Sequence, residues 1–381
     1  MRYSFNALLL VPRSTGMRTQ MLGTLQGLRD LDGDDEWVVF LRPGLRDALP
    51  LPQWDRCKYV EIPEARTLPG RLWVELYGLP AYERRAGIDV SYSPTIYLPL
   101  APPRPAAFTV VDFCWLRAPQ GYSRAQLLSY HLRFQSSLLN TCAVATLTET
   151  VREELLTRFE VPRQLPCAAT LSGVDPSFFR PPPPETAQAL RQRLGLPASD
   201  RLLLGSGGTN PRKNVTTLVR AFARLPRALR RQTHLVIPGP REPRAEQRLL
   251  APLSDEVRSR IHFTGFLPAN EAVALHGLAD LFAFPTLDEG LGLPALEAQA
   301  AGLPTILSDI PVLREVGGPS AVYAPPTEVD AWTAAIASAF DDDAQLARRA
   351  DNGRRWASAF TWKSVADRIV SLLRQVSTAR G

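Results

Sequence analysis

The sequence predicts an α/β protein built from two doubly wound domains that face a central cleft. Strand-sized apolar runs alternate with helical patterns along almost the whole chain, which is typical of βαβ units around a parallel sheet. A run of prolines interrupts the alternation near the middle, and a length of 381 residues fits two domains of similar size. Ligands of such proteins bind at the carboxyl ends of the strands, so the cleft is the expected site.

The first half contains six short apolar runs with four helical stretches between them. The expected strands are residues 7–11, 37–41, 58–62, 90–92, 107–111 and 143–147, and the expected helices are 18–31, 71–85, 124–139 and 148–159. Helices of this length between strands predict a parallel sheet.

Arg180 is followed by four prolines, which form a stiff spacer and predict the domain boundary. We therefore expect domains at residues 1–180 and 185–360. The expected strands of the second half are 202–204, 234–237, 261–263, 281–284, 305–307 and 321–323. The chain is expected to be helical from residue 328 onward, with the aspartates 341–343 as a cap between helices.

The composition excludes several classes of protein. No apolar run approaches the roughly 20 residues that cross a bilayer, and the N-terminal residues show no signal-peptide pattern. We expect a cytoplasmic protein, with peripheral contact at the inner face of the membrane as an addition. The net charge of +6 is spread over both halves without a basic and aromatic stripe, so no nucleic-acid partner is expected. The arginine-rich residues 220–248 are interpreted as solvated helix faces, with anion or membrane contact as the lesser alternative.

The cysteines and histidines predict neither a disulfide framework nor a metal site. They are scattered without ligand spacing, at Cys57, Cys114, Cys142 and Cys167, and at His131, His234, His262 and His276. His262 alternates with apolar residues and is interpreted as a hydrogen-bonded strand residue. We expect no metal and no cofactor.

The strongest motif is a glycine-containing loop between an apolar strand and a helix. It runs Phe284-Pro285-Thr286-Leu287-Asp288-Glu289-Gly290-Leu291-Gly292-Leu293-Pro294-Ala295-Leu296-Glu297. Pro294 marks a first helical turn, and Gly290 and Gly292 let backbone N–H groups approach an anion there. Glu289 and Glu297 can accept hydrogen bonds from sugar and ribose hydroxyls. Taken alone, Glu297 would more often complement a helix dipole, but the whole string in order favours a binding site.

A second glycine loop follows the first strand of the second half. It runs Leu204-Gly205-Ser206-Gly207-Gly208-Thr209-Asn210-Pro211-Arg212-Lys213-Asn214, before an expected helix at 215–224. Its spacing matches neither a P-loop nor a dinucleotide fingerprint. Of the 44 basic residues only Lys58, Lys213 and Lys363 are lysines. A lysine in this loop indicates that a compact ammonium is needed to bind pyrophosphate oxygens. The alternative, that the lysine has no special role and occurs there by chance, suits Lys58 and Lys363 better.

These motifs resemble those of the retaining glycosyltransferases of the GT-B fold known as family 4, or group 1, in its bacterial mannosyltransferase-like branch. That family carries E-x7-E around E-G-F-G-L-P, here with Leu291 in place of the usual aromatic residue, and its P-R-K-N is similar to residues 211–214. Looser matches are Ser172-Gly173-Val174-Asp175, Ser308 with Glu315, and Phe360-Thr361-Trp362. The resemblance covers nearly the full chain and is more specific in the second half.

The resemblance implies a metal-free site. Lys213 and Arg212 would stabilise the leaving diphosphate, Glu289 would bind a sugar hydroxyl and Glu297 the ribose. The other implied site residues are the backbone of Gly290, Leu291 and Gly292, together with Asp112, Gly16 and Thr209. The resemblance also implies that residues 361–381 form a helix that crosses back onto the first, acceptor-side domain.

Three departures from the family pattern concern mainly the acceptor side. Val111 stands where the family commonly has a histidine before Asp112. The glycine-rich loop after the first strand is reduced to residues 14–18, and one residue is missing between Thr209 and Pro211. Asp112 or Arg18 is expected to compensate for the absent imidazole.

The implied function is transfer of a hexose from a nucleotide sugar to a glycan or lipid-linked glycan, in polysaccharide biosynthesis at the cell envelope. GDP-mannose is the first expectation for the donor, ahead of UDP- and dTDP-sugars. The alternatives are a catalytically silent homologue that binds a nucleotide sugar, which Val111 favours, and a nucleotide-sugar epimerase of similar fold. The E-x7-E string argues against the epimerase.

Overall fold

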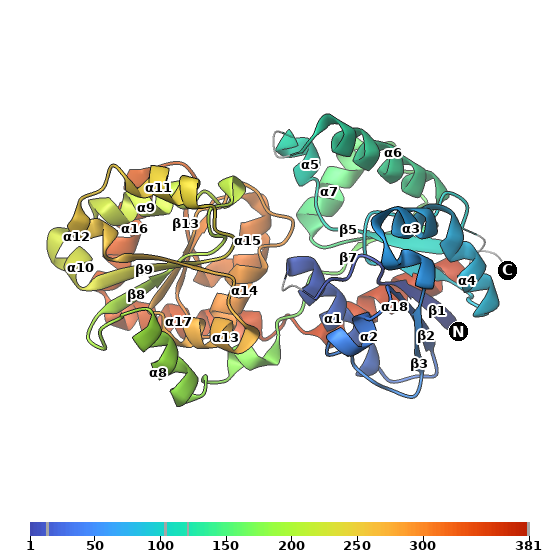
Figure 1. Cartoon of the computed structure of the whole chain (residues 1–381), viewed down its shortest axis with the longest axis horizontal. Coiled ribbons are helices and arrows are strands. Elements are labelled where there is room, and N and C mark those ends of the chain that lie inside the picture. The colour runs from blue at the N-terminus through green and yellow to red at the C-terminus, as the bar shows by residue number, and fades with distance from the viewer. Residues whose placement is uncertain (13–14, 103–104, 120–121, 379–381) are drawn as a thin grey trace. The chain divides into compact units, whose positions relative to one another are not determined.

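The computed structural model describes residues 1–12, 15–102, 105–119 and 122–378, and it divides into two compact units (Figure 1). Unit 1 comprises residues Met1–Gly173 and the chain from Phe360 onward; unit 2 is Val174–Ala359. The division falls after Gly173, before the proline run at which the sequence places the boundary. Phe178 is buried and its ring centroid lies 5.1 Å from that of His276, so the segment before the prolines packs within unit 2.

The described residues of unit 1 form seven parallel strands in two hydrogen-bonded groups. The first group has the order β1-β2-β3 and the second β4-β5-β6-β7, and a bridge between Tyr3 and Val90 joins β1 to the second group. The strands are β1 (Arg2–Asn6), β2 (Glu36–Leu41), β3 (Cys57–Glu61), β4 (Ser91–Ser93), β5 (Ala106–Val110), β6 (Ala143–Thr146) and β7 (Cys167–Ala169). The strands β2 and β3 therefore lie on one side of β1, and the later strands β4 to β7 lie on its other side. The order of the strands reverses between β1 and β4, which makes this the switch point of unit 1.

Helices connect the strands of unit 1 as the sequence predicts. They are α1 (Gly16–Arg29), α2 (Leu45–Ala48), η1 (Pro63–Arg66), α3 (Leu68–Trp73), the π-helical turn η2 (Val74–Gly78), α4 (Leu79–Arg85), α5 (Cys114–Arg117), α6 (Arg124–Asn140) and α7 (Glu149–Arg158). The terminal helix α18 (Trp362–Thr378) packs on α1, where Trp362 lies so close to Gly23 that a side chain at that position would overlap its ring.

The expected strand at residues 7–11 is wrong, because the strand is β1, five residues earlier. β1 alternates, with Tyr3 and Phe5 buried among apolar residues while the buried Ser4 donates a 2.7 Å hydrogen bond to Glu83. The apolar run after it is buried as a turn, in which Leu10 N–H donates to the Ala7 carbonyl at 3.0 Å. β7 was not predicted from the sequence, because Cys167–Ala169 is too short to show a period.

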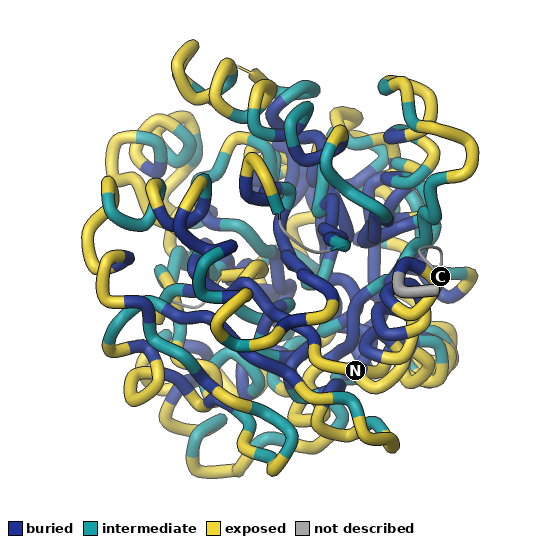
Figure 2. The backbone as a smooth tube through the Cα atoms, turned by 90° about the vertical axis from the view of Figure 1, so that its right-hand side faces the viewer, coloured by how far each residue is buried: buried dark blue, intermediate teal, exposed yellow. Residues whose placement is uncertain are grey.

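Unit 2 contains one six-stranded parallel sheet of order β10-β9-β8-β11-β12-β13. Its strands are β8 (Arg201–Leu204), β9 (Thr233–Pro238), β10 (Ile261–Gly265), β11 (Leu281–Phe284), β12 (Thr305–Ser308) and β13 (Val322–Ala324), which confirms the six predicted positions closely. Most of these strand residues are buried. Figure 2 colours the backbone by burial, with buried stretches dark blue and exposed stretches, mostly at the periphery, yellow. Direction reverses between β8 and β11, so the switch point of this sheet lies there.

The helices of unit 2 cover this sheet. They are α8 (Pro184–Arg193), α9 (Val215–Arg224), α10 (Arg227–Arg231), α11 (Pro243–Leu250), α12 (Asp255–Arg258), α13 (Ala269–Leu278), α14 (Leu293–Ala300), α15 (Pro311–Gly317), α16 (Val329–Asp341) and α17 (Asp343–Ala357), with 3₁₀ turns η4 (Pro176–Phe179), η5 (Pro211–Lys213) and η6 (Gly318–Ser320). Asp342 is the N-cap of α17 and accepts from Gln345 N–H at 2.8 Å, as predicted.

Two minor predictions are also confirmed. Most arginines between residues 220 and 248 are exposed on helices, namely those at 220, 224, 227, 231, 244 and 248, and Arg224 pairs with Asp330 at 2.7 Å. His262 is a strand residue whose Nε2 lies 2.8 Å from Nδ1 of His234, so its ring is hydrogen-bonded. No described helix is long and apolar enough to traverse a bilayer.

Candidate functional site

Two loops at the switch point of unit 2 carry most of the predicted site residues. β8 and β11 are neighbours, with Phe282 opposite Leu204, and each strand leads through a loop into a helix. The loop after β8 spans residues 205–214 and the loop after β11 spans 285–292. Because both strands are parallel, both loops leave the same edge of the sheet, where ligands of doubly wound folds bind.

Three predicted side chains meet between these loops, and we call them the Lys213–Glu289 cluster: Lys213, Arg212 and Glu289. Lys213 Nζ donates to Glu289 Oε1, and Arg212 Nη1 lies 3.3 Å from Oε2 of the same carboxylate. The Thr286 hydroxyl donates to Glu289 Oε1 at 3.0 Å. Only 8% of the Glu289 side chain and 14% of that of Lys213 are exposed, so solvent screens this charge pair weakly.

The backbone of both loops is shaped to bring the cluster together. Gly207 has a φ of +102°, and a side chain there would overlap the aliphatic part of Lys213. Glycine is therefore required for the lysine to lie along the loop. The Arg212 carbonyl accepts from Leu287 N–H at 2.9 Å, which ties the two loops to each other, and it lies 3.1 Å from the Thr286 hydroxyl oxygen.

Asn214 joins three loops and is a residue to which the sequence assigned no role. It occupies the left-handed region, with φ of +50°, which asparagine tolerates better than most residues. Its side-chain amide donates to the carbonyls of Pro285 at 3.0 Å and Pro326 at 2.7 Å. Asn214 therefore positions the preceding Lys213, and its place in the lysine motif was the signal available in the sequence.

Thr209, predicted to bind substrate, lies outside the cluster. Its N–H and hydroxyl both donate to the Pro240 carbonyl, at 2.8 Å and 3.2 Å. In this structure Thr209 holds the loop after β8 against the loop after β9.

The N-terminus of α14 lies at the end of the second loop. Gly292 is its N-cap, with a φ of +84°, and the neighbouring Leu291 is buried. The N–H groups of Leu291 and Gly292 donate to none of the described residues. Amides next to a helix N-terminus attract anions, so this backbone can bind phosphate.

Glu297 lies in the second turn of α14. Helix formation begins at Leu293, so Glu297 is too far from the terminus to act as a cap. Burial, with the charge of Asp175 as the second cause, raises its pKa to about 8. Within the described part of the chain its carboxylate has neither a hydrogen bond nor an ion pair. A carboxylate in this state is stabilised by any hydroxyl donor that reaches it.

The predicted residues of unit 1 lie in loops after its strands. Asp112 follows β5 and accepts from Cys114 N–H at 2.9 Å, which starts α5. Val111, also after β5, is half-buried. Gly16 is the first residue of α1 and has open space around it. The neighbouring Ser14, part of the reduced loop, lies outside the described residues, and Arg18 N–H donates to the Thr15 hydroxyl at 3.1 Å.

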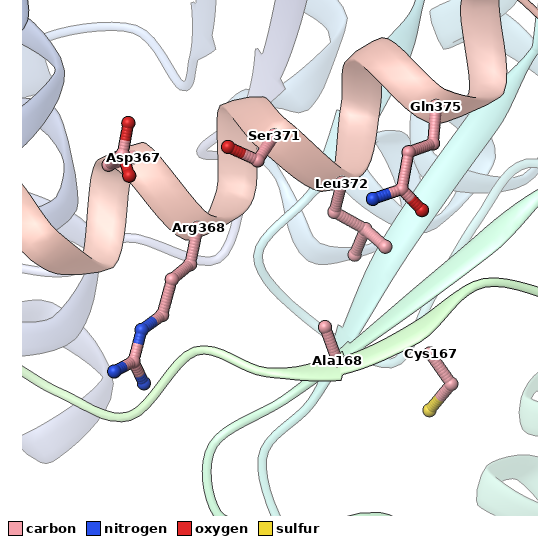
Figure 3. A pocket seen from close by; sticks show the side chains of 7 residues that line it. All are labelled: Cys167, Ala168, Asp367, Arg368, Ser371, Leu372 and Gln375. Atoms are coloured by element: carbon pink, nitrogen blue, oxygen red, sulfur yellow. The ribbon is translucent and has the colours of Figure 1, made fainter.

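A pocket of about 300 Å³ in unit 1 contains none of the predicted site residues. Figure 3 shows it between β7 and α18, with Cys167, Arg368 and Ser371 among its lining. Burial raises the pKa of the Cys167 thiol to about 11, so it stays protonated near neutral pH and is a poor nucleophile. The described residues include no group of three or more His, Cys, Asp or Glu side chains placed to hold a metal ion.

Comparison with known families identifies the segment that contains the Lys213–Glu289 cluster. Residues 186–356 match the model of a family described as glycosyl transferases group 1. This part of the chain is similar to that family. The match covers the whole sheet of unit 2, both loops of the site, and α14.

Two curated relatives from Escherichia coli share this region. The serotype-specific mannosyltransferase WbdA is 33% identical over 185 residues, which are 48% of this chain and 22% of WbdA. The O-antigen chain mannosyltransferase B is 26% identical over 284 residues, 74% of this chain and 73% of the relative. The chain thus spans about a fifth of the length of the first relative and about three quarters of the second.

A solved structure extends the similarity to both units. Anabaena Alr3699/HepE in complex with UDP-glucose aligns with a TM-score of 0.74 at 17% identity, over 98% of this chain and all of that one. The α/β fold with two parallel sheets is accordingly the GT-B fold, as the sequence predicts.

Proposed function

We propose that the protein is a retaining, metal-independent glycosyltransferase that moves a hexose from a nucleotide sugar to a glycan or lipid-linked glycan. The observation that carries this proposal is the Lys213–Glu289 cluster at the switch point of unit 2, beside the amides of Leu291 and Gly292, which have no partner among the described residues. Mannose from GDP-mannose is the proposed donor, because both relatives from E. coli are mannosyltransferases. The UDP-glucose of HepE supports a nucleotide-sugar donor without selecting the base.

In the proposed complex, Lys213 and Arg212 bind the diphosphate and stabilise the negative charge that grows as it leaves. Glu289 accepts a hydrogen bond from a sugar hydroxyl, and Glu297 accepts from the ribose. The acceptor oxygen forms a bond to the anomeric carbon on the face from which the phosphate oxygen departs. The acceptor proton passes to that phosphate oxygen, so the nucleoside diphosphate and the new glycoside are the products.

The two units have separate roles in this proposal. Unit 2 binds the donor, and unit 1 binds the acceptor through the loops that contain Asp112 and Gly16. The proposed location is the cytoplasm, in polysaccharide biosynthesis at the cell envelope.

One observation favours a second candidate, a catalytically silent homologue that binds a nucleotide sugar. Val111 supplies no hydrogen-bond donor, and one oxygen of Asp112 already accepts from Cys114 N–H. If neither Asp112 nor Arg18 reaches the sugar, donor binding persists while turnover fails.

The proposal is tested by thermal unfolding with GDP, UDP, dTDP and ADP, followed by donor hydrolysis in the presence and absence of EDTA. A ligand that binds the folded state raises the unfolding temperature by mass action. We expect one diphosphate to stabilise the protein most, and turnover to survive EDTA. A flat response to all four nucleotides would refute donor binding; binding without turnover on any acceptor would favour the silent homologue.

We also propose that unit 1 contacts an anionic membrane surface. Large apolar side chains are exposed along α3, η2 and α6: Leu68, Trp73, Tyr77, Leu128, Leu132 and Leu139. α6 has an exposed arginine, Arg124, and no acidic residue, which suits an anionic surface that also accepts apolar side chains. Cosedimentation with phosphatidylglycerol vesicles should fall for Trp73→Ser combined with Leu132→Ser. Unchanged cosedimentation would exclude this surface.

A further inference from the structure

A second concentration of charge lies in unit 1, away from every residue that the sequence assigned. We call it the arginine cluster: Arg42, Arg71, Arg133, Glu75 and Tyr97. Arg133 Nη2 lies 2.8 Å from Glu75 Oε2, and Arg71 Nε lies 3.3 Å from Glu75 Oε1. The Arg133 guanidinium carbon is 3.6 Å from the centroid of the Tyr97 ring, a cation–π contact. Arg42 donates to the Leu10 carbonyl at 2.7 Å.

The positive charge of this cluster is not balanced. Three guanidiniums, which stay charged at any physiological pH, lie near the carboxylate of Glu75, and two of them, Arg71 and Arg133, pair with it. Glu75 is 3% exposed, and the side chains of Arg71 and Arg133 are 21% and 15% exposed. Burial, followed by repulsion from Arg71, lowers the pKa of Arg42. The cluster therefore holds excess positive charge where water screens it poorly.

Hydrogen-bonding capacity is also left over. The Nε atoms of Arg42 and Arg133 are buried without a hydrogen-bond partner among the described residues. Arg71 Nε and Glu75 Oε1 make no hydrogen bond either, but they face each other as the 3.3 Å ion pair. Buried polar atoms in native proteins are nearly always paired, so donors left in this state point to a missing acceptor.

The arginine cluster lies at the ligand-binding edge of the unit 1 sheet. Arg42 directly follows β2, Tyr97 follows β4, and Arg71 and Glu75 lie on the helical segment that follows β3. In the order β3-β2-β1-β4, β4 borders the switch point, and β2 and β3 lie on its other side, beyond β1. Glu75 belongs to η2, and such π-helical turns are frequent at functional sites.

We propose that the arginine cluster binds an anionic group, a phosphate or carboxylate, on the sugar acceptor. Planar guanidiniums match these anions with paired hydrogen bonds. In this assignment Arg42 and Arg71 contact the anion, while Glu75 and Tyr97 are positioning residues that fix Arg133 and Arg71. The assignment of the ligand to the acceptor rests on the proposed glycosyltransferase function; the anion site itself does not.

The alternative is a purely structural cluster that joins α6 to η2. A structural cluster would lower stability when mutated but would give no response to anions. The two are separated by measuring stability with and without an anion, rather than stability alone.

The experiment titrates inorganic phosphate against chloride at constant ionic strength, with the nucleoside diphosphate that stabilises the protein most held at saturation. The nucleotide occupies the site in unit 2, so any further rise in unfolding temperature reports a second anion site. We expect the rise in wild type and in Arg66→Gln, the control, because Arg66 is an exposed arginine on the neighbouring η1. We expect its loss in Arg42→Gln and in Arg71→Gln, and partial retention in Arg42→Lys.

The outcomes separate this proposal from the proposed function. A nucleotide response in Arg42→Gln shows that the variant is folded and binds donor. A phosphate response that persists in both glutamine variants, or that is absent from wild type, overturns the arginine cluster as an anion site. If phosphate raises the unfolding temperature but no nucleotide does, the anion site stands and the proposed function is refuted.

The source of the anion is then determined with acceptors. For a phosphorylated or carboxylated glycan, Arg42→Gln should raise the acceptor KM by about tenfold to a hundredfold and leave the donor KM unchanged. A neutral glycan should show no such change. If Arg42→Gln instead abolishes binding to phosphatidylglycerol vesicles and leaves the KM for the charged glycan unchanged, the anion is a lipid headgroup and the assignment to the acceptor is wrong.

Discussion

Replacing Lys213 by alanine should weaken binding of the nucleoside diphosphate by about 1.5–3 kcal/mol, the range for hydrogen bonds to a charged group. This is roughly a tenfold to 150-fold increase in Kd. Lys213 is 14% exposed and its ammonium lies 5.0 Å from the centroid of the Phe284 ring, so its charge acts in a weakly screened place. Arg212 remains within reach of the same ligand, which keeps the expected loss below that of an isolated buried charge.

Glu289→Gln should have the opposite signature. In the structure the Glu289 carboxylate pairs with Lys213, so it competes with the diphosphate for the ammonium. Removing the negative charge should leave nucleoside diphosphate affinity unchanged or slightly raised. It should reduce the extra affinity that the sugar contributes, because the carboxylate is the proposed acceptor for a sugar hydroxyl.

Isothermal titration calorimetry with the diphosphate and with its sugar nucleotide measures both effects. Lys363→Ala is the control, since Lys363 lies on α18 in unit 1 with 57% of its side chain exposed. Diphosphate affinity of Lys213→Ala equal to that of wild type would refute the phosphate assignment. Equal losses of diphosphate and sugar nucleotide in Glu289→Gln would refute the role of Glu289 at the sugar.

Three further predictions concern titration and turnover. The pKa of Glu297 is about 8 in the folded protein and 4.5 ordinarily, so the unfolded chain ionises first and the free energy of unfolding falls as pH rises from 4.5 to 8. Glu297→Gln should abolish that fall in the free energy of unfolding, measured by urea titrations across pH. It should also abolish the tightening of nucleotide binding as pH rises through 8. If the variant keeps the pH dependence of the wild type, the raised pKa of Glu297 is wrong. Burial, then the charge of His234, lowers the pKa of His262 from 6.5 to about 4, so stability should decline by about 1–2 kcal/mol as pH falls through that window, and His262→Gln should flatten the decline. Val111→His should raise turnover by up to about a hundredfold if no neighbour supplies the missing donor, and by little if Asp112 or Arg18 compensates; donor hydrolysis rates distinguish the two cases.

The sequence predicted the fold of unit 2 better than that of unit 1, for a physical reason. Strands buried on both faces are short apolar runs, and β11 has the predicted bounds of residues 281–284 because all four of its residues are buried. β1 mixes the buried polar Ser4 with Tyr3 and Phe5, so the apolar run after it gave a stronger but misleading signal. The proline run likewise led to a domain boundary that lies later in the sequence than the division between the two units, because Pro182 packs within unit 2 against Gly277.

The site was predictable where chemistry and sequence order coincide. Lys213 and Glu289 were predicted from glycine loops after two strands, and the sheet order then brings those strands side by side. The pairing of Lys213 with Glu289 was not predictable, because it depends on which strands are neighbours. The arginine cluster was missed for the same reason. Its members come from separate elements, and the only local signal is the i,i+4 spacing of Arg71 and Glu75.

The choice of lysine at residue 213 gains a structural explanation from Gly207. The chain uses arginine for nearly every positive charge, yet the side chain at 213 lies against a glycine that has no room for even a Cβ. Arg212 approaches the same carboxylate from the adjacent position, so a second planar guanidinium would have to share the narrow space between the two loops. A compact ammonium donates in several directions from one point, to Glu289 in the free protein and to a diphosphate when one binds. Gly207 and Lys213 therefore act together: because Gly207 has no side chain, the side chain of Lys213 has room to place its ammonium beside Glu289.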